Sequence, residues 1–326
     1  MADDMGYAAS SGSGAGYATS QGPDAGNDYG KVNNPPSVYG GPDTPQVSGI
    51  TSGLGNGVNL QPSYDNNGDV DLGWDLMKKN PKIKAVRIEI EAAVKMAIVK
   101  RWIQEAVAGG YQVIATYHDH TCLGSDDAAK LQTAATWWES NYAALKSAGD
   151  FTINVMNEWG SAGITPFDFA SSYNKALGVI RKFYAGPVII DIPGYGQATQ
   201  IAYQAIKNQS TTRITDTKLI LSMHIYDDSG QYRNNKWQVL QNGDLDELAS
   251  TGLGCMVGEF GSKIAGTPAP AVVDYARSRG WPVFGWAWNG DGGILNMLSP
   301  GFQPFNPAKN ATYTPTGYFQ TIYGKL

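Results

Sequence analysis

The chain has 326 residues, of which 42% are hydrophobic and only 16% are charged, and its formal net charge is -5. This composition is that of a globular protein with a sizeable core, and a negative charge without any basic run excludes nucleic acid as a partner. No apolar stretch approaches the roughly 20 residues that cross a bilayer, so we expect no membrane partner.

Residues 1–47 are dominated by Gly, Ser, Ala, Asn, Asp and Pro and have no sustained apolar period. Such a segment offers little apolar area to offset the entropy of ordering its backbone, so we predict a low-complexity tail or linker. Residues 48–326 are predicted to form one catalytic domain. The N-terminus lacks a basic segment followed by an apolar core, so we expect that any signal peptide has been removed.

Short apolar runs recur every 30 to 40 residues after the tail, and amphipathic stretches separate them. The runs predict strands, and their number equals that of a (β/α)8 barrel. They lie near residues 57–60, 85–90, 112–117, 151–156, 187–192, 218–224, 255–260 and 283–288.

The runs are apolar along nearly their whole length, which is typical of parallel strands buried on both faces. Between them, residues 126–146 and 166–184 show helical spacing, with Pro166 in a first helical turn. We therefore predict an α/β fold, a TIM barrel. A doubly wound open sheet is the rival, but the loop after the first run lacks a Gly-rich phosphate fingerprint.

Polar side chains fall within or directly after several of these runs. They are Arg87, His118, Asn157, Glu158, His224, Tyr226 and Glu259. In a barrel the carboxyl ends of all strands meet at one face, where active sites form. A retaining glycoside hydrolase needs a proton donor and a nucleophilic carboxylate about 5 to 5.5 Å apart, and Glu158 and Glu259 fit these roles if their strands face each other.

The motifs around these residues resemble glycoside hydrolase family 5. The sequences INVMNEW at residues 153–159 and VGEFG at 257–261 look like that family's two catalytic strands. Further similar segments are YHD at 117–119, IDIPGYGQ at 190–197, HIY at 224–226 and GWAWNG at 285–290. The bacterial-type β-mannanase branch is the most similar, although residues 61–73 differ from it.

The resemblance implies the roles of the residues nearest the reaction. Glu158 would be the general acid/base and Glu259 the nucleophile. Asn157 would bind the 2-hydroxyl of the reacting sugar, and Arg87 and Tyr226 would hold Glu259 ionised and aimed.

The resemblance also implies a set of residues that bind substrate. His118 and His224 would line the subsite for the reacting sugar, and Trp288 would be the aromatic platform beneath it. Trp159, at the end of the first motif, is assigned to the same group. No cofactor is implied.

Three features are interpreted without a function or left open. Cys122 and Cys255 would lie on distant strands, so we expect two separate, buried thiols. His118 and His120 lack partners for a closed metal site, so no metal is expected. Glu89 and Glu91 follow Arg87 where the mannanase branch is less acidic, and one of them could enter the cleft or cap the next helix.

The favoured function is a secreted, monomeric endo-β-1,4-mannanase acting on a plant-type polysaccharide. An endo-β-1,4-glucanase with the same catalytic pair is the alternative, because mannose and glucose differ only in the orientation of one hydroxyl. A polysaccharide-binding barrel without activity would have lost one carboxylate, and both are present. A barrel enzyme of another class would need a phosphate-binding loop, which Asp291 in the 289–293 loop disfavours.

Overall fold

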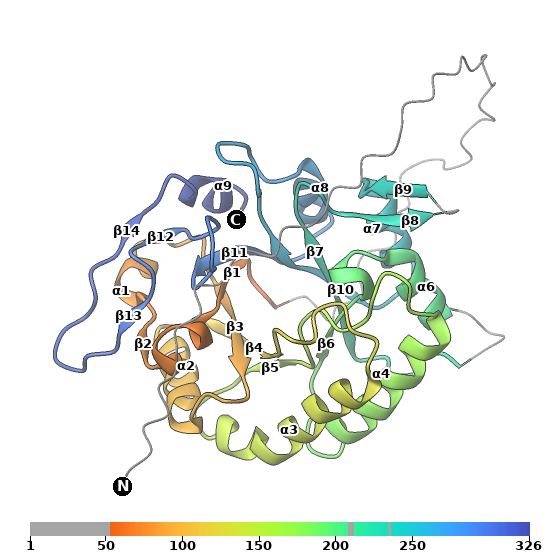
Figure 1. Ribbon diagram of the computed structural model, residues 1–326, viewed down its shortest axis with the longest axis horizontal. Coiled ribbons are helices and arrows are strands. Elements are labelled where there is room, and N and C mark those ends of the chain that lie inside the picture. Colours follow the sequence, from red (N-terminus) through yellow and green to blue (C-terminus); the bar gives the residue numbers. More distant parts are fainter. Residues whose placement is uncertain (1–52, 208–211, 234–235) are drawn as a thin grey trace, which may run out of the picture. The chain divides into compact units, whose positions relative to one another are not determined.

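The computed structural model describes residues 53–207, 212–233 and 236–326. Within them, eight parallel strands form a closed barrel in which sequential strands pair and the last closes onto the first (Figure 1). The strands are β1 (Gly57–Leu60), β3 (Ala85–Glu91), β4 (Gln112–His118), β5 (Thr152–Asn154), β6 (Val188–Asp191), β7 (Leu219–Ile225), β10 (Gly254–Phe260) and β11 (Val283–Asn289). The predicted barrel is confirmed and the open sheet is wrong; the predicted tail lies outside the described residues.

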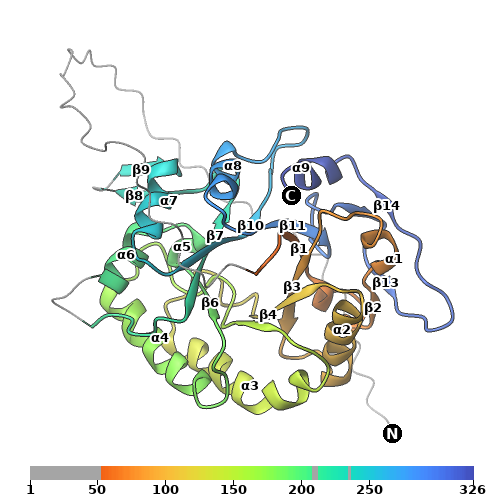
Figure 2. The same ribbon diagram turned by 180° about the vertical axis from the view of Figure 1, so that it is seen from behind.

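Helices cover the outside of the barrel, as Figures 1 and 2 show from opposite sides. The longer ones are α2 (Met96–Ala108), α3 (Ala128–Lys146), α4 (Pro166–Ile180), α6 (Thr199–Lys207), α7 (Asn242–Ala249) and α8 (Ala271–Ser278). The Asp127 side chain caps α3, and the Thr165 side chain caps α4 ahead of Pro166. None of the helices in the described ranges is long and apolar enough to cross a membrane.

Shorter elements decorate the barrel. They are the helices α1 (Trp74–Met77), α5 (Pro193–Gly196) and α9 (Phe319–Tyr323), the 3-10 turns η1 (Pro62–Tyr64) and η2 (Asn66–Gly68), and the strand pairs β2 (Val70–Asp71) with β13 (Gln303–Pro304), β8 (Gly230–Arg233) with β9 (Lys236–Val239) and β12 (Leu298–Ser299) with β14 (Thr314–Pro315). Cys122 and Cys255 are free and buried, as expected.

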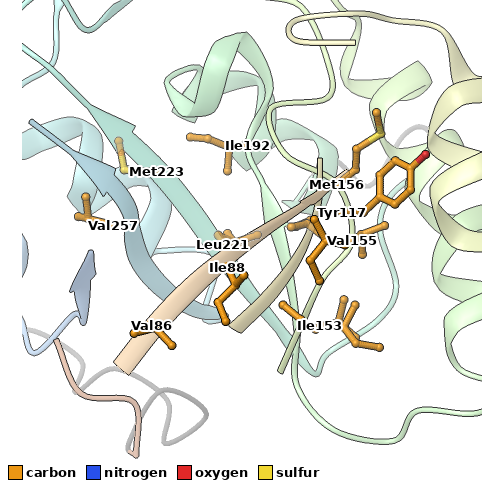
Figure 3. Packing of buried hydrophobic residues seen from close by; sticks show 14 of the residues in the cluster. Val86, Ile88, Tyr117, Ile153, Val155, Met156, Ile192, Leu221, Met223 and Val257 are labelled. Atoms are coloured by element: carbon orange, nitrogen blue, oxygen red, sulfur yellow. The ribbon is translucent and has the colours of Figure 1, made fainter. Parts of the chain in front are cut away.

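Strand β3 shows how one sequence serves two environments. Val86 and Ile88 belong to the large apolar cluster between the strands and the helices, part of which Figure 3 shows. Because successive side chains of a strand point to opposite faces, Ala85, Arg87 and Glu89 face the barrel interior. The charged residues of this apolar run therefore lie inside the barrel.

A separate apolar layer fills the interior below the charged residues. It is formed by Ala85, Ile114, Ile189, Ile220, Met256 and Phe284, one from each of six strands. We call these six residues the lower layer. All are at most 1% exposed, as expected for the packed interior of a (β/α)8 barrel.

Candidate active site

Arg87 is the centre of a polar network that joins strands from opposite sides of the barrel. Its Nε donates to Asn154 Oδ1 at 3.0 Å, and its Nη2 donates to Asn157 Oδ1 at 2.7 Å and Asp191 Oδ2 at 3.2 Å. Its Nη1 donates to Asn59 Oδ1 at 3.0 Å, to Glu259 Oε1 at 3.0 Å and to Glu89 Oε1. Because Arg87 is fully buried, these partners fix its position.

Glu259 lies on β10 and is held at both carboxylate oxygens. Arg87 Nη1 donates to Oε1, and the Tyr226 hydroxyl donates to Oε2 at 2.7 Å. Burial raises the pKa of Tyr226 well above its usual value, and the Glu259 carboxylate raises it further, so the phenol stays a donor. The predicted roles of Arg87 and Tyr226 as partners of Glu259 agree with these contacts.

Glu158 follows β5 in an unusual backbone conformation, with φ at 49°. Its N–H donates to Asp191 Oδ2 at 3.0 Å, and its carbonyl accepts from the Gly124 N–H at 2.8 Å. A non-glycine residue in the left-handed region costs free energy, and the surrounding contacts must hold it there. The result is a carboxylate directed at His224 Nδ1, 2.8 Å from Glu158 Oε1.

The two carboxylates meet over His224. One oxygen of Glu158, one oxygen of Glu259 and a ring nitrogen of His224 lie within 4.8 Å of one another. This spacing could also suit a cation, but Glu259 already contacts the guanidinium of Arg87, which would repel one. The arrangement fits a pair of carboxyl groups acting on one bond.

His224 is fully buried beneath the pair. Burial disfavours the imidazolium, but the carboxylates of Glu259 and Asp191 raise the pKa of His224 well above its usual value. Conversely, burial disfavours ionised Asp191, but His224 and Arg87 hold the pKa of that carboxyl below its usual range. The buried ring contacts Glu158, Asp191 and Glu259, and the expectation that His224 lines the sugar subsite stays a prediction.

Asp191 was not among the predicted site residues, although the sequence carried its signal. The signal is a charged residue in an otherwise apolar strand: Asp191 is the last residue of β6, and Glu259 lies near the end of β10. It contacts Arg87, Asn154 and the Glu158 backbone. It therefore supports both the guanidinium and the loop that carries Glu158.

His118, at the end of β4, is 4% exposed and pairs with Glu91 Oε1 at 2.8 Å. Burial opposes its charged form, but the hydrogen bond with Glu91 and the nearby carboxylates of Glu89, Glu91 and Glu259 together raise the pKa of His118. His120 contacts the same Glu91 oxygen. Neither Glu89 nor Glu91 caps α2, whose N-terminus has no side-chain cap. Glu89 lies in the barrel interior against Arg87, and Glu91 contacts the two histidines.

Two predicted sugar-binding tryptophans are buried instead. Trp159 is 0% exposed, donates from its indole to Asp127 O at 2.9 Å and stacks on Phe169. Trp288 is also 0% exposed and donates to Leu72 O at 2.9 Å. Neither ring has a face available to a ligand, so both predictions are wrong.

Trp286 is the partly exposed ring of the same strand. Its carbonyl accepts from Tyr318, whose hydroxyl is also bonded by the backbone of Ser262 near Glu259. Opposite β1, the register shifts so that Val58 and Leu60 pair with Gly285 and Asn289. This irregularity breaks the alternation of faces. It places Trp288 in the outer cluster and leaves Trp286 partly exposed, with its indole donating to Asp291 Oδ1 at 3.0 Å.

The fold and the site together define an eight-stranded barrel with a carboxylate pair at the carboxyl ends of its strands. The family model described as Cellulase (glycosyl hydrolase family 5) matches residues 70–292, so the chain belongs to glycoside hydrolase family 5.

The chain is also similar, at low identity, to relatives of known function. A mannan endo-1,4-beta-mannosidase of Streptomyces lividans is 28% identical over 57% of this chain and 49% of its own length. A beta-mannanase/endoglucanase A of Caldicellulosiruptor saccharolyticus is 28% identical over 60% of this chain but 15% of its own length. This chain thus spans about half or less of these curated relatives.

The solved structures support the fold. The catalytic domain of a Streptomyces sp. SirexAA-E mannanase superposes with a TM-score of 0.61, at 20% identity over 84% of this chain and 85% of that one. A Thermobifida fusca endoglucanase has a TM-score of 0.62, at 17% identity over 83% of this chain and 91% of its own.

Proposed function

We propose that this protein is a retaining endo-β-1,4-mannanase that works through a covalent glycosyl-enzyme. The observation that carries the proposal is the spacing of the pair: oxygens of Glu158 and Glu259 lie within 4.8 Å. Retaining enzymes place their carboxyl groups about 5 to 5.5 Å apart, whereas inverting enzymes leave about 6.5 to 9.5 Å for a water molecule.

In the first step Glu158 protonates the glycosidic oxygen while Glu259 attacks the anomeric carbon. The C–O bond to the leaving sugar breaks, and a bond forms between the anomeric carbon and a Glu259 oxygen. Arg87 and Tyr226 fix both oxygens of Glu259, so the attacking lone pair needs little reorientation.

In the second step Glu158, now ionised, removes a proton from water, and that water displaces Glu259 from the anomeric carbon. Two inversions return the β configuration. Arg87 holds the amide oxygen of Asn157, which directs the amide nitrogen of Asn157 as a donor for the sugar 2-hydroxyl. Such a bond strengthens as positive charge develops on the sugar.

Mannan is the favoured substrate because the Streptomyces relative and a Cellvibrio japonicus relative, 25% identical over 60% of this chain, are mannan endo-1,4-beta-mannosidases. A β-1,4-glucanase is the second candidate, favoured by the endoglucanase names of the Caldicellulosiruptor and Thermobifida proteins. Because a polymer of either kind cannot enter a cell, we propose that the enzyme is secreted.

Product analysis tests the proposal. The purified protein, the Glu259→Ala variant and a Glu139→Ala control are incubated with galactomannan, glucomannan and carboxymethylcellulose. Glu139 is a surface residue paired with Lys182, so its loss should leave activity intact. Manno-oligosaccharides from the parent and the control only are expected. If only carboxymethylcellulose were cleaved, mannan would be the wrong substrate. If none of the three glycans were cleaved, the proposal that the protein is an enzyme would be wrong.

A further inference from the structure

One nitrogen of Arg87 has more acceptors than hydrogens. A guanidinium Nη carries two hydrogens, yet Arg87 Nη1 has three acceptors: Asn59 Oδ1 and Glu259 Oε1, both at 3.0 Å, and Glu89 Oε1, which is the nearest. The other two nitrogens have as many acceptors as hydrogens. Glu89 and the nucleophile therefore compete for the same donor.

Glu89 is not explained by the two-step mechanism. It is fully buried on β3, and its Oε2 has no hydrogen-bond partner among the described residues. It does not reach solvent, so it cannot contact the substrate directly. A buried carboxyl group with an unsatisfied oxygen lowers the stability of the fold. An apolar residue would fill the same space without this cost, so packing alone does not account for Glu89.

The charged and titratable groups facing Glu89 come from five elements. They are Arg87 on its own strand, His118 on β4, Asp191 on β6, Glu259 on β10 and Tyr64 on η1. Burial raises the pKa of Glu89 to about 7; Arg87 and His118 oppose this shift, and Glu259 and Asp191 add to it. The carboxyl group therefore changes charge in the neutral range, where its neighbours Arg87 and Asp191 do not.

We propose that Glu89 is a positioning residue whose charge state sets how firmly Arg87 holds the nucleophile. When Glu89 is neutral, it is the weakest of the three acceptors, and the Nη1 hydrogens serve Glu259 and Asn59. When Glu89 is ionised, it takes one of these hydrogens and places a second negative charge beside Glu259. Glu259 and Asn59 then share the one Nη1 hydrogen that remains, so Arg87 holds the nucleophile less firmly and turnover falls. This inference rests on the proposed role of Glu259.

The first test compares the pH dependence of kcat and KM for the parent and Glu89→Gln between pH 5 and 9. Glutamine keeps the shape of the neutral acid and cannot ionise. The two proteins are expected to agree within about twofold in kcat at pH 5, with the variant ahead by up to about tenfold at pH 8.5 and KM little changed. A purely structural role would lower the variant equally at every pH, so a constant ratio overturns the proposal.

Glu105→Gln is the matched control. Glu105 also pairs with an arginine, Arg101 at 3.2 Å, but on the outer helix α2. Its variant should follow the parent across the whole pH range. A control that reproduced the alkaline gain of Glu89→Gln would show that any lost carboxylate has this effect and would overturn the specific role of Glu89.

The second test needs no activity and so separates this inference from the proposed function. A carboxyl group whose pKa is raised on folding stabilises the fold fully below its unfolded pKa, and this contribution is lost as pH rises through its folded pKa. The melting temperature of Glu89→Gln relative to the parent should therefore rise between pH 5 and 8. No change in this difference overturns the proposal even if the enzyme cleaves mannan, whereas inactivity of the parent on every glycan would overturn the function alone.

If Glu89→Gln does not fold, the same question is put to Glu158→Gln, which keeps Glu89 and removes the general acid. Carbon-13 NMR of glutamate carboxyl groups should show one signal that titrates at about pH 7. A protein in which every glutamate titrates below about pH 5.5 overturns the proposal.

Discussion

The barrel interior contains two layers of opposite chemistry on the same strands. An upper layer is formed by the residues that lie two positions further along the same six strands. These residues are Arg87, Thr116, Asp191, Ser222, Gly258 and Trp286. The lower layer is apolar and packs tightly, whereas the upper layer holds buried charges and hydrogen bonds. Two residues along each strand thus separate the apolar side chains that stabilise the barrel from the residues that serve the site.

The difference shows where the free energy of folding comes from. Burying apolar surface stabilises by about 25 cal/mol per Å², whereas a buried charge is costly unless its partners compensate. The network of Arg87, Asp191 and Glu259 is thus held in place by the layer below it and by the outer cluster of Figure 3. Variants of the lower layer should therefore change stability alone, whereas variants of the polar network should change activity, stability or both.

The largest effect is expected for Glu259→Ala. Removing the nucleophile should lower kcat on mannan by about 10⁴-fold or more, because the covalent intermediate forms on the Glu259 carboxylate. Initial rates and the melting temperature are measured together. Ile220→Val, in the lower layer, is the control and should keep the parent kcat; a Glu259→Ala variant with more than about a tenth of parental kcat would contradict the role.

The next effect is on stability. Arg87→Met leaves Glu89, Asp191 and Glu259 without their shared cation, which should cost about 3 to 5 kcal/mol and abolish activity. Ile220→Ala should cost about 2 to 5 kcal/mol through its cavity while the folded protein keeps its kcat. Urea unfolding gives both free energies. A fully stable Arg87→Met variant would show that the network does not depend on the guanidinium.

The two tryptophans of β11 sharpen the comparison. Trp286→Ala should lower kcat/KM by about tenfold through the loss of an aromatic face, with little change in stability. Trp288→Ala should instead lower stability by about 3 to 5 kcal/mol, because the ring is buried. Steady-state kinetics and urea unfolding distinguish the pair, and the reverse assignment would restore Trp288 as the platform.

The smallest effect is expected for Thr116→Val. The Thr116 hydroxyl donates to Asn154 Oδ1 at 3.2 Å, and Asn154 in turn accepts from Arg87. Losing one such bond costs about 0.5 to 1.5 kcal/mol in an isosteric change. Urea unfolding should detect this loss with kcat within about twofold of the parent. A larger fall in kcat would mean that Thr116 positions Arg87 more directly than its single bond indicates.

The sequence was enough to predict the barrel, because eight apolar runs with helical stretches between them leave few other folds. Arg87, Glu158 and Glu259 could be found because a charge inside or just after a buried strand must face the interior or the carboxyl end. Asp191 carried the same signal and was missed. Trp288 could not be separated from Trp286, because both occupy the same face in a regular strand and only the register shift against β1 distinguishes them.

The most direct test of the account is to trap the covalent intermediate. The parent is incubated with a 2-deoxy-2-fluoro-β-mannosyl fluoride. Its 2-fluorine slows both formation and hydrolysis of the glycosyl-enzyme, whereas its good leaving group speeds formation alone, so the intermediate accumulates. Digestion and mass spectrometry should then find one added fluorosugar on the peptide containing Glu259. A label on another residue, or active enzyme that forms no adduct and releases products of inverted configuration, would contradict the role of Glu259.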